Sequence, residues 1–136
     1  TPLWPFGHGL SYTRFEISEP RAEATFWSGE SLTVEVDVAN VGARDGATTV
    51  FLFLRDRVAS TTRPIMELKR FETVDLAAGE RRTLRLTLAP EDFFCLGPDM
   101  VARAEPGVFD LLVGESADRE TLRSVSVTLL GEALVA

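Results

Sequence analysis

One short segment near the start of the chain places a serine close to the only histidine. Residues 9–13, GLSYT, differ from the Gly-X-Ser-X-Gly pattern of a nucleophile elbow only at the last position, where threonine replaces glycine. That motif also needs a strand before the serine and a helix after it. Here a Pro- and Gly-rich stretch precedes Ser11 and an alternating run follows it, so we expect no hydrolase triad. The glycines on either side of His8 instead allow the backbone to turn sharply.

Acidic side chains are abundant, so adjacent pairs say little about catalysis. Glu16 with Glu19, and Glu91 with Asp92, are typical of solvated surface groups. A glycosidase needs two carboxyl groups across a cleft at a set separation, and a small β-domain offers shallow loops instead. One His and one Cys are too few for a structural zinc site or an internal disulfide. We therefore expect no catalytic residue, no cofactor and no metal site in this chain.

Aromatic residues offer a different chemistry, because flat rings can stack on the faces of sugar rings. Phe26 and Trp27 lie just before a Ser-Gly turn, where a ring can be exposed, and they are the candidates for a sugar platform. The alternative is that these rings fill the core or pack on a neighbouring domain.

Length and charge limit the classes of protein to which these residues can belong. The chain has 136 residues, which fits one domain, and 14 basic against 21 acidic residues give a net charge of −7. This balance leaves no electrostatic footprint for nucleic acid or an anionic membrane surface. No apolar run approaches the ~20 residues that cross a bilayer. The expected partners therefore include neither nucleic acid nor membrane.

Short alternating runs separated by turn residues make up most of the chain. In residues 32–38, LTVEVDV, the aliphatic side chains face one way and the polar ones the other, as in a strand with one buried face. Residues 50–54 are continuously apolar, which suits a strand buried on both faces or one with a partner domain on its outer face. Residues 90–94 predict one short helical turn. We predict an all-β fold, an immunoglobulin-like or fibronectin type III-like β-sandwich of about seven antiparallel strands with no long helix.

Four stretches together resemble one known family over nearly the whole chain. Residues 3–15, LWPFGHGLSYTRF, are similar to the entry segment of the C-terminal fibronectin type III-like domain of glycoside hydrolase family 3 enzymes, which are β-glucosidases, β-xylosidases and related exo-acting enzymes. Residues 31–42, 68–80 and 105–114 look like its later strands and turns. The chain departs from the pattern at Arg70, where glycine is frequent, and at Ala77, where proline is frequent. Both departures bear on local loop shape.

The resemblance implies a division of the chain and a role without catalysis. Residues 1–12 would be an interdomain linker or docking segment, 13–131 the sandwich and 132–136 a C-terminal tail. In this family the nucleophilic aspartate lies in a Ser-Asp-Trp-like motif of an N-terminal barrel, and the acid/base glutamate comes from the following domain. No Ser-Asp-Trp occurs here, so no catalytic residue is carried over. The residues expected to dock on catalytic domains of the same parent chain are Trp4, Phe6, His8, Leu10 and Tyr12.

Four functions are weighed on these grounds. The first, which the resemblance favours, is a non-catalytic stabilising or docking domain of a family 3 glycosidase that hydrolyses terminal β-linked sugars. The second is a polysaccharide-binding module, with Trp27 or Trp4 as its platform. The third is an immunoglobulin-like protein-interaction domain, and the fourth an independent enzyme; the glycosidase-type entry segment argues against the third.

Overall fold

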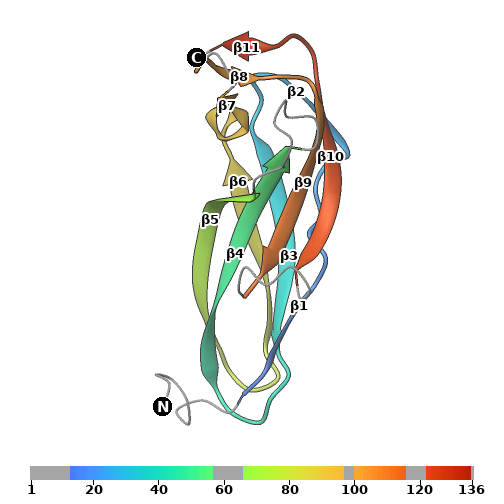
Figure 1. Cartoon of the computed structure of the whole chain (residues 1–136). Helices are drawn as coiled ribbons and strands as arrows, with labels where there is room; N and C mark the ends of the chain where they lie inside the picture. The colour runs from blue at the N-terminus through green and yellow to red at the C-terminus, as the bar shows by residue number, and fades with distance from the viewer. Residues whose placement is uncertain (1–12, 57–65, 97–99, 116–121, 136) are drawn as a thin grey trace.

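The computed structural model describes residues 13–56, 66–96, 100–115 and 122–135. These residues form an elongated domain of eleven strands and one short 3-10 helix (Figure 1). No helix among them is long and apolar enough to span a membrane. The elements are β1 (Phe15–Ile17), β2 (Thr25–Trp27), β3 (Leu32–Asn40), β4 (Gly46–Asp56), β5 (Met66–Leu76), β6 (Arg81–Leu88), η1 (Pro90–Phe93), β7 (Cys95–Leu96), β8 (Ala102–Ala104), β9 (Gly107–Gly114), β10 (Arg123–Leu130) and β11 (Leu134–Val135).

The strands form two main sheets and one small sheet. The three-stranded sheet has the order β1-β3-β6, and the five-stranded sheet the order β2-β10-β9-β4-β5. The small sheet, β11-β8-β7, lies at the top end of the domain in Figure 1, beside η1. This arrangement confirms the predicted all-β fibronectin type III-like sandwich and the absence of a long helix.

The structure differs from the prediction in its shortest strands. Five of the eleven strands have only two or three residues; β1 lies in the alternating run after Ser11, and the other four are too short to show a period in the sequence. One of them, β2, pairs with β10 in parallel, whereas antiparallel strands alone were expected. Another, β11, pairs with β8, so Leu134 and Val135 of the expected tail form a strand.

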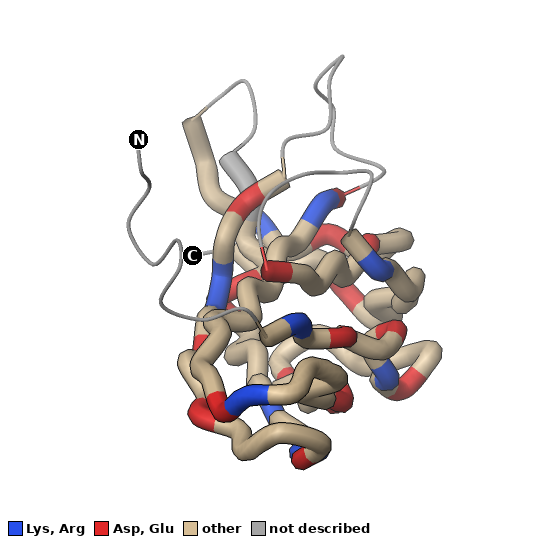
Figure 2. The backbone as a smooth tube through the Cα atoms, turned by 90° about the horizontal axis from the view of Figure 1, so that it is seen from below, with Lys and Arg blue, Asp and Glu red and all other residues tan. Residues whose placement is uncertain are grey.

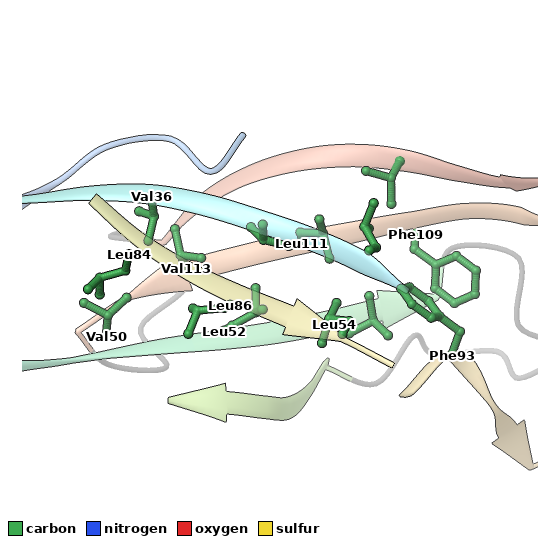
Figure 3. Close-up of a cluster of buried hydrophobic side chains, with 14 of the residues drawn as sticks. Val36, Val50, Leu52, Leu54, Leu84, Leu86, Phe93, Phe109, Leu111 and Val113 are labelled. Atoms are coloured by element: carbon green, nitrogen blue, oxygen red, sulfur yellow. The ribbon is translucent and has the colours of Figure 1, made fainter. Parts of the chain in front are cut away.

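The core lies between the two main sheets and follows the predicted alternation. Every second residue of β3 from Leu32 to Val38 is fully or almost fully buried, as are the leucines of β6. The facing side chains come from β4 and β9 (Figure 3). Burying each such aliphatic side chain contributes about 1.5–3 kcal/mol. The opposed side chains labelled in the figure are Val36, Leu84 and Leu86 from one sheet and Val50, Leu52, Leu54, Leu111 and Val113 from the other.

The predicted helical turn is confirmed as η1, and it closes one end of the core. Its Phe93 is only 1% exposed and packs edge-on to Phe109, with ring centroids 5.2 Å apart. Asp92 holds the turn in place, because its Oδ2 accepts hydrogen bonds from Ala89 N at 2.8 Å and Arg70 Nη2 at 2.6 Å. Arg70, a departure from the family pattern, thus has a structural partner here.

At the other end of the domain a buried asparagine joins three segments. The amide of Asn40 donates to main-chain oxygens of Arg44 at 2.8 Å and Leu76 at 3.1 Å, and its Oδ1 accepts from Gly42 N at 3.0 Å and from the hydroxyl of Thr13. Gly42 passes so close to Thr13 that an added Cβ would lie 2.7 Å from the Thr13 Cα. The chain therefore enters the sandwich at a closely packed junction.

Candidate functional site

The predicted docking segment cannot be placed. Trp4, Phe6, His8, Leu10 and Tyr12 all lie outside the described residues, so their docking role stays a prediction.

The two residues of the predicted sugar platform have opposite environments. Successive residues of a strand point to opposite faces, and in β2 this sends Phe26 into the core and Trp27 outward. Phe26 is 5% exposed, and its ring lies 4.7 Å from that of Phe93. Trp27 is 59% exposed. Because a buried ring cannot stack on a sugar, the platform prediction must be corrected for Phe26, and among the described residues it rests on Trp27.

A tight turn presents Trp27 at the surface. Its main-chain N donates to Glu30 Oε1 at 2.9 Å, and Glu30 N donates back to the Trp27 main-chain oxygen at 3.0 Å. Gly29 makes this turn with a φ of 89°, which side chains rarely allow. Gly131 borders the ring, since an added Cβ there would lie 3.3 Å from Trp27 Cε3. The main chain of Trp27 is thus fixed in the turn, and its indole lies beside Gly131 at the edge of the sheet.

A larger apolar surface covers part of the outer side of the five-stranded sheet, across β9, β4 and β5. We call it the apolar face; its residues are Phe51, Phe53, Leu68, Phe71 and Leu112. Phe51 stands opposite Phe71, and Phe53 stands opposite both Leu68 and Leu112. The Phe51 ring lies 6.3 Å from Phe53 and 6.2 Å from Phe71. Exposure rises toward the edge strand β5, to 47% for Leu68 and 65% for Phe71.

A β-bulge places both exposed residues of β5 on the same side. Leu52 pairs with Arg70 and Phe53 with Leu68, so Lys69 is an extra residue in the ladder. An extra residue resets which face the following side chains occupy. Without it, Leu68 and Phe71 would point to opposite faces, because they are three positions apart and the side-chain period is two. For this reason no periodic pattern in the sequence marks Leu68 and Phe71, although the apolar run at 50–54 indicates the same face.

An ion pair borders the apolar face. Arg55 donates from Nε and Nη2 to Asp110 Oδ2 at 3.0 and 2.7 Å, and Ser126 donates to Asp110 Oδ1 at 2.9 Å. The Asp110 side chain is 2% exposed. A buried carboxylate is tolerated when its lone pairs are satisfied in this way. The border of the apolar face is therefore charged, and its charged groups are paired with each other.

The outer side of the three-stranded sheet is polar instead. Across β3 and β6, Glu35 accepts from Arg85 at 2.8 Å and Asp37 accepts from Thr83 at 2.7 Å. Arg21 also donates to both Asp37 oxygens at 3.0 and 3.1 Å, and these bonds hold the pKa of Asp37 below its usual range. Figure 2 shows acidic and basic positions interspersed along the described chain. These side chains face solvent and are joined to one another by hydrogen bonds and ion pairs across the strands.

A hollow between β1, β3 and the end of β9 gathers several carboxylates. Its ionisable lining residues are Glu16, Glu19, Asp37, Arg81, Glu115 and Arg123. The lowered pKa of Asp37 keeps it ionised near neutral pH, which does not suit a general acid. Within the described ranges no group of three or more His, Cys, Asp or Glu side chains could hold a metal ion. The hollow therefore gives no support for a catalytic or metal site.

The fold and these surfaces define a fibronectin-type β-sandwich with one polar outer side and an apolar face on part of the other. A family model described as "Fibronectin type III-like domain" matches residues 48–117. The chain belongs to this family, as its entry segment and strand pattern predicted.

The relatives of the chain are much longer than it is. It is 39% identical over 87% of its length to a periplasmic β-glucosidase of Salmonella typhimurium, and 37% identical over 95% to a β-xylosidase of Formosa agariphila. It spans 16% and 18% of those two proteins. A solved β-glucosidase from Listeria innocua, in complex with glucose, matches 98% of the chain at 35% identity with a TM-score of 0.82, over 18% of that structure. A β-glucosidase structure from Erythrobacter marinus matches 96% of the chain at 40% identity with a TM-score of 0.80. The chain is thus a domain of the type that forms a small part of these enzymes.

Proposed function

We propose that the chain is a non-catalytic accessory domain of a glycoside hydrolase family 3 enzyme, which it stabilises by docking on the catalytic domains. One observation carries this: the chain is matched over 87% of its own length by a β-glucosidase of which it spans only 16%. A domain of this size forms only a small part of such a protein, and most of that protein lies outside it. The apolar face gives the domain a surface suited to contact with that body.

The parent enzyme would hydrolyse terminal β-linked sugars, as a β-glucosidase or β-xylosidase, by a retaining mechanism. Its nucleophilic aspartate and acid/base glutamate would lie in domains outside this chain, as the family resemblance implies. Asp37 supports this division, because hydrogen bonds from Arg21 hold its pKa below the usual range, and such a carboxyl is a poor proton donor.

Deletion of residues 1–136 from the full-length enzyme tests the proposal. A docked domain contributes buried apolar area to the whole protein, so its removal lowers the melting temperature. We expect this loss to exceed the change in kcat per correctly folded active site. The matched measurement is hydrolysis of nitrophenyl glycosides, normalised to active sites titrated with a covalent inhibitor. An unchanged melting temperature would contradict the accessory role, and turnover by residues 1–136 alone would contradict the absence of catalysis.

The exposed Trp27 favours a second candidate, a polysaccharide-binding module. A ring that is 59% exposed and fixed by a tight turn has the form of a stacking platform. This candidate predicts retention of the full-length enzyme on insoluble cellulose, xylan or chitin, and loss of retention in Trp27→Ala. Equal recovery of both proteins in the unbound fraction would exclude it.

A further inference from the structure

The outer sides of the two main sheets differ in a way that the fold alone does not require. On β3 and β6 three of the four outward pairs are polar and bonded: Glu35 with Arg85 at 2.8 Å, Asp37 with Thr83 at 2.7 Å, and the hydroxyls of Thr33 and Thr87 3.4 Å apart. On β4 and β5 the corresponding outward pairs include Phe51 with Phe71. Strands that face water on one side normally alternate apolar and polar residues. The five-stranded sheet breaks this rule at its centre and at its β5 edge.

The apolar face is continuous over three strands. It runs from Leu112 on β9, through Phe53 and Phe51 on β4, to Leu68 and Phe71 on β5. Phe53 and Leu112 are 8% and 6% exposed and Phe51 is partly buried, whereas Leu68 and Phe71 leave 47% and 65% of their surface exposed. The bulge at Lys69 puts both onto this side, and bulges are typically retained features that re-aim side chains. Exposed apolar patches of this kind mark sites of protein contact.

We propose that the apolar face is the surface by which the domain docks on the catalytic portion of the same polypeptide, while the β3–β6 side faces solvent. This inference rests on the proposed function and names the surface of the domain that makes the contact. The length of the related enzymes indicates which partner covers this surface. In the β-glucosidase of Salmonella typhimurium the matched part is 16% of the protein, which leaves 84% (100 − 16) beyond it.

The small area of the apolar face favours contact with a domain of the same polypeptide over contact with a second molecule of the protein. Phe71 and Leu68 together expose on the order of 200 Å² of apolar surface, judged from the 150–250 Å² of a whole aromatic side chain. A stable complex of separate proteins needs about 800 Å² on each partner. A tethered partner is present at an effective concentration in the millimolar range, about 1 mM or more for a short linker, so a small face suffices.

The test is cysteine labelling of the full-length enzyme under native conditions. Phe71→Cys and Leu68→Cys report on the apolar face, and Thr33→Cys is the matched control, exposed on the opposite sheet. The parent without an added cysteine gives the background. We expect the two reporters to react with a maleimide about tenfold more slowly than the control, because thiol reactivity follows access. In denaturant the three rates should become equal.

Two outcomes would overturn the inference. Reporters that label as fast as Thr33→Cys would show that the face is open to solvent; if Phe71→Cys fails to fold, Leu68→Cys alone decides. Protection that disappears on dilution would show that a second copy covers the face. Neither outcome touches the accessory role, which the melting temperature of the deleted enzyme tests separately.

Discussion

The side-chain amide of Asn40 donates a 3.1 Å hydrogen bond to the main-chain oxygen of Leu76, and so joins the end of β3 to the end of β5 in the opposite sheet. The main chain of Asn40 stays bonded within its own sheet, to the turn before β6, because Gly79 N donates to the Asn40 main-chain oxygen at 2.9 Å and Asn40 N donates to the Glu80 main-chain oxygen at 2.8 Å. The side chain of Asn40 therefore links the two sheets at the end where the chain enters at Thr13.

Replacing Asn40 should destabilise the domain strongly. Asn40→Leu would leave the buried carbonyl of Leu76 and the amide of Gly42 without these partners, at a cost of about 1–3 kcal/mol for each such group. We expect a total loss of about 3 kcal/mol in the free energy of unfolding, measured by urea denaturation. Val41→Ala, at the exposed neighbouring position, is the control and should cost much less. A loss in Asn40→Leu no larger than in that control would contradict the bonding role.

Asp92 should contribute to the stability of the domain through its bonds with Arg70 and Ala89, and not through its position in η1. Asp92→Ala removes the ion pair with Arg70 and the bond from Ala89 N, with an expected loss of about 1–2 kcal/mol in unfolding free energy. Glu91→Ala alters the exposed neighbour and should stay within about 0.5 kcal/mol. In a double-mutant cycle with Arg70→Ala, the combined loss should be smaller than the sum. Additive losses would show that the ion pair adds nothing.

The sequence predicted those parts of the fold in which local pattern and tertiary environment agree. Residues 32–38 alternate in the printed sequence and lie with their aliphatic side chains in the core, because a nine-residue strand has room for several periods. The turn at η1 was predicted for a similar reason, since proline at its first position is a local signal.

The remaining features depend on contacts between distant segments. Nothing local in Thr25–Trp27 indicates that it pairs in parallel with β10, and the bulge at Lys69 appears only when β4 and β5 are aligned. The role of Asn40 depends on where Arg44, Leu76 and Thr13 come to lie. The candidate surfaces were therefore predicted only in part: residues 50–54 indicated the apolar face, but its two most exposed members did not show in the pattern.

Asp37 should make the stability of the domain sensitive to acid. Hydrogen bonds from Arg21, and then from Thr83, hold the pKa of Asp37 below its usual range. A carboxyl with a lower pKa in the folded state stabilises the fold above its unfolded pKa, and this contribution is lost as the pH falls through the folded value. We expect a loss below about pH 4, smaller in Asp37→Asn than in the parent domain.

Urea denaturation at a series of pH values measures this effect, with Glu23→Gln at an exposed position as the control. Added salt should weaken the difference, because Arg21 and Asp37 are both partly exposed. The same acid dependence in Asp37→Asn and in Glu23→Gln would rule out a special contribution from Asp37.

Phe26 and Trp27 are neighbours in sequence, yet their replacement should have opposite consequences. Phe26→Ala opens a cavity against Phe93 and should cost about 3–5 kcal/mol of unfolding free energy. Trp27→Ala removes a ring that is mostly in water and should cost less than about 1 kcal/mol. Urea denaturation of the two variants measures both values. A large loss in Trp27→Ala would mean that the ring supports the turn at Gly29 and Gly131, and any loss of polysaccharide retention in that variant would then reflect unfolding. A small loss, with the turn intact, leaves retention as a direct measure of the indole as a platform.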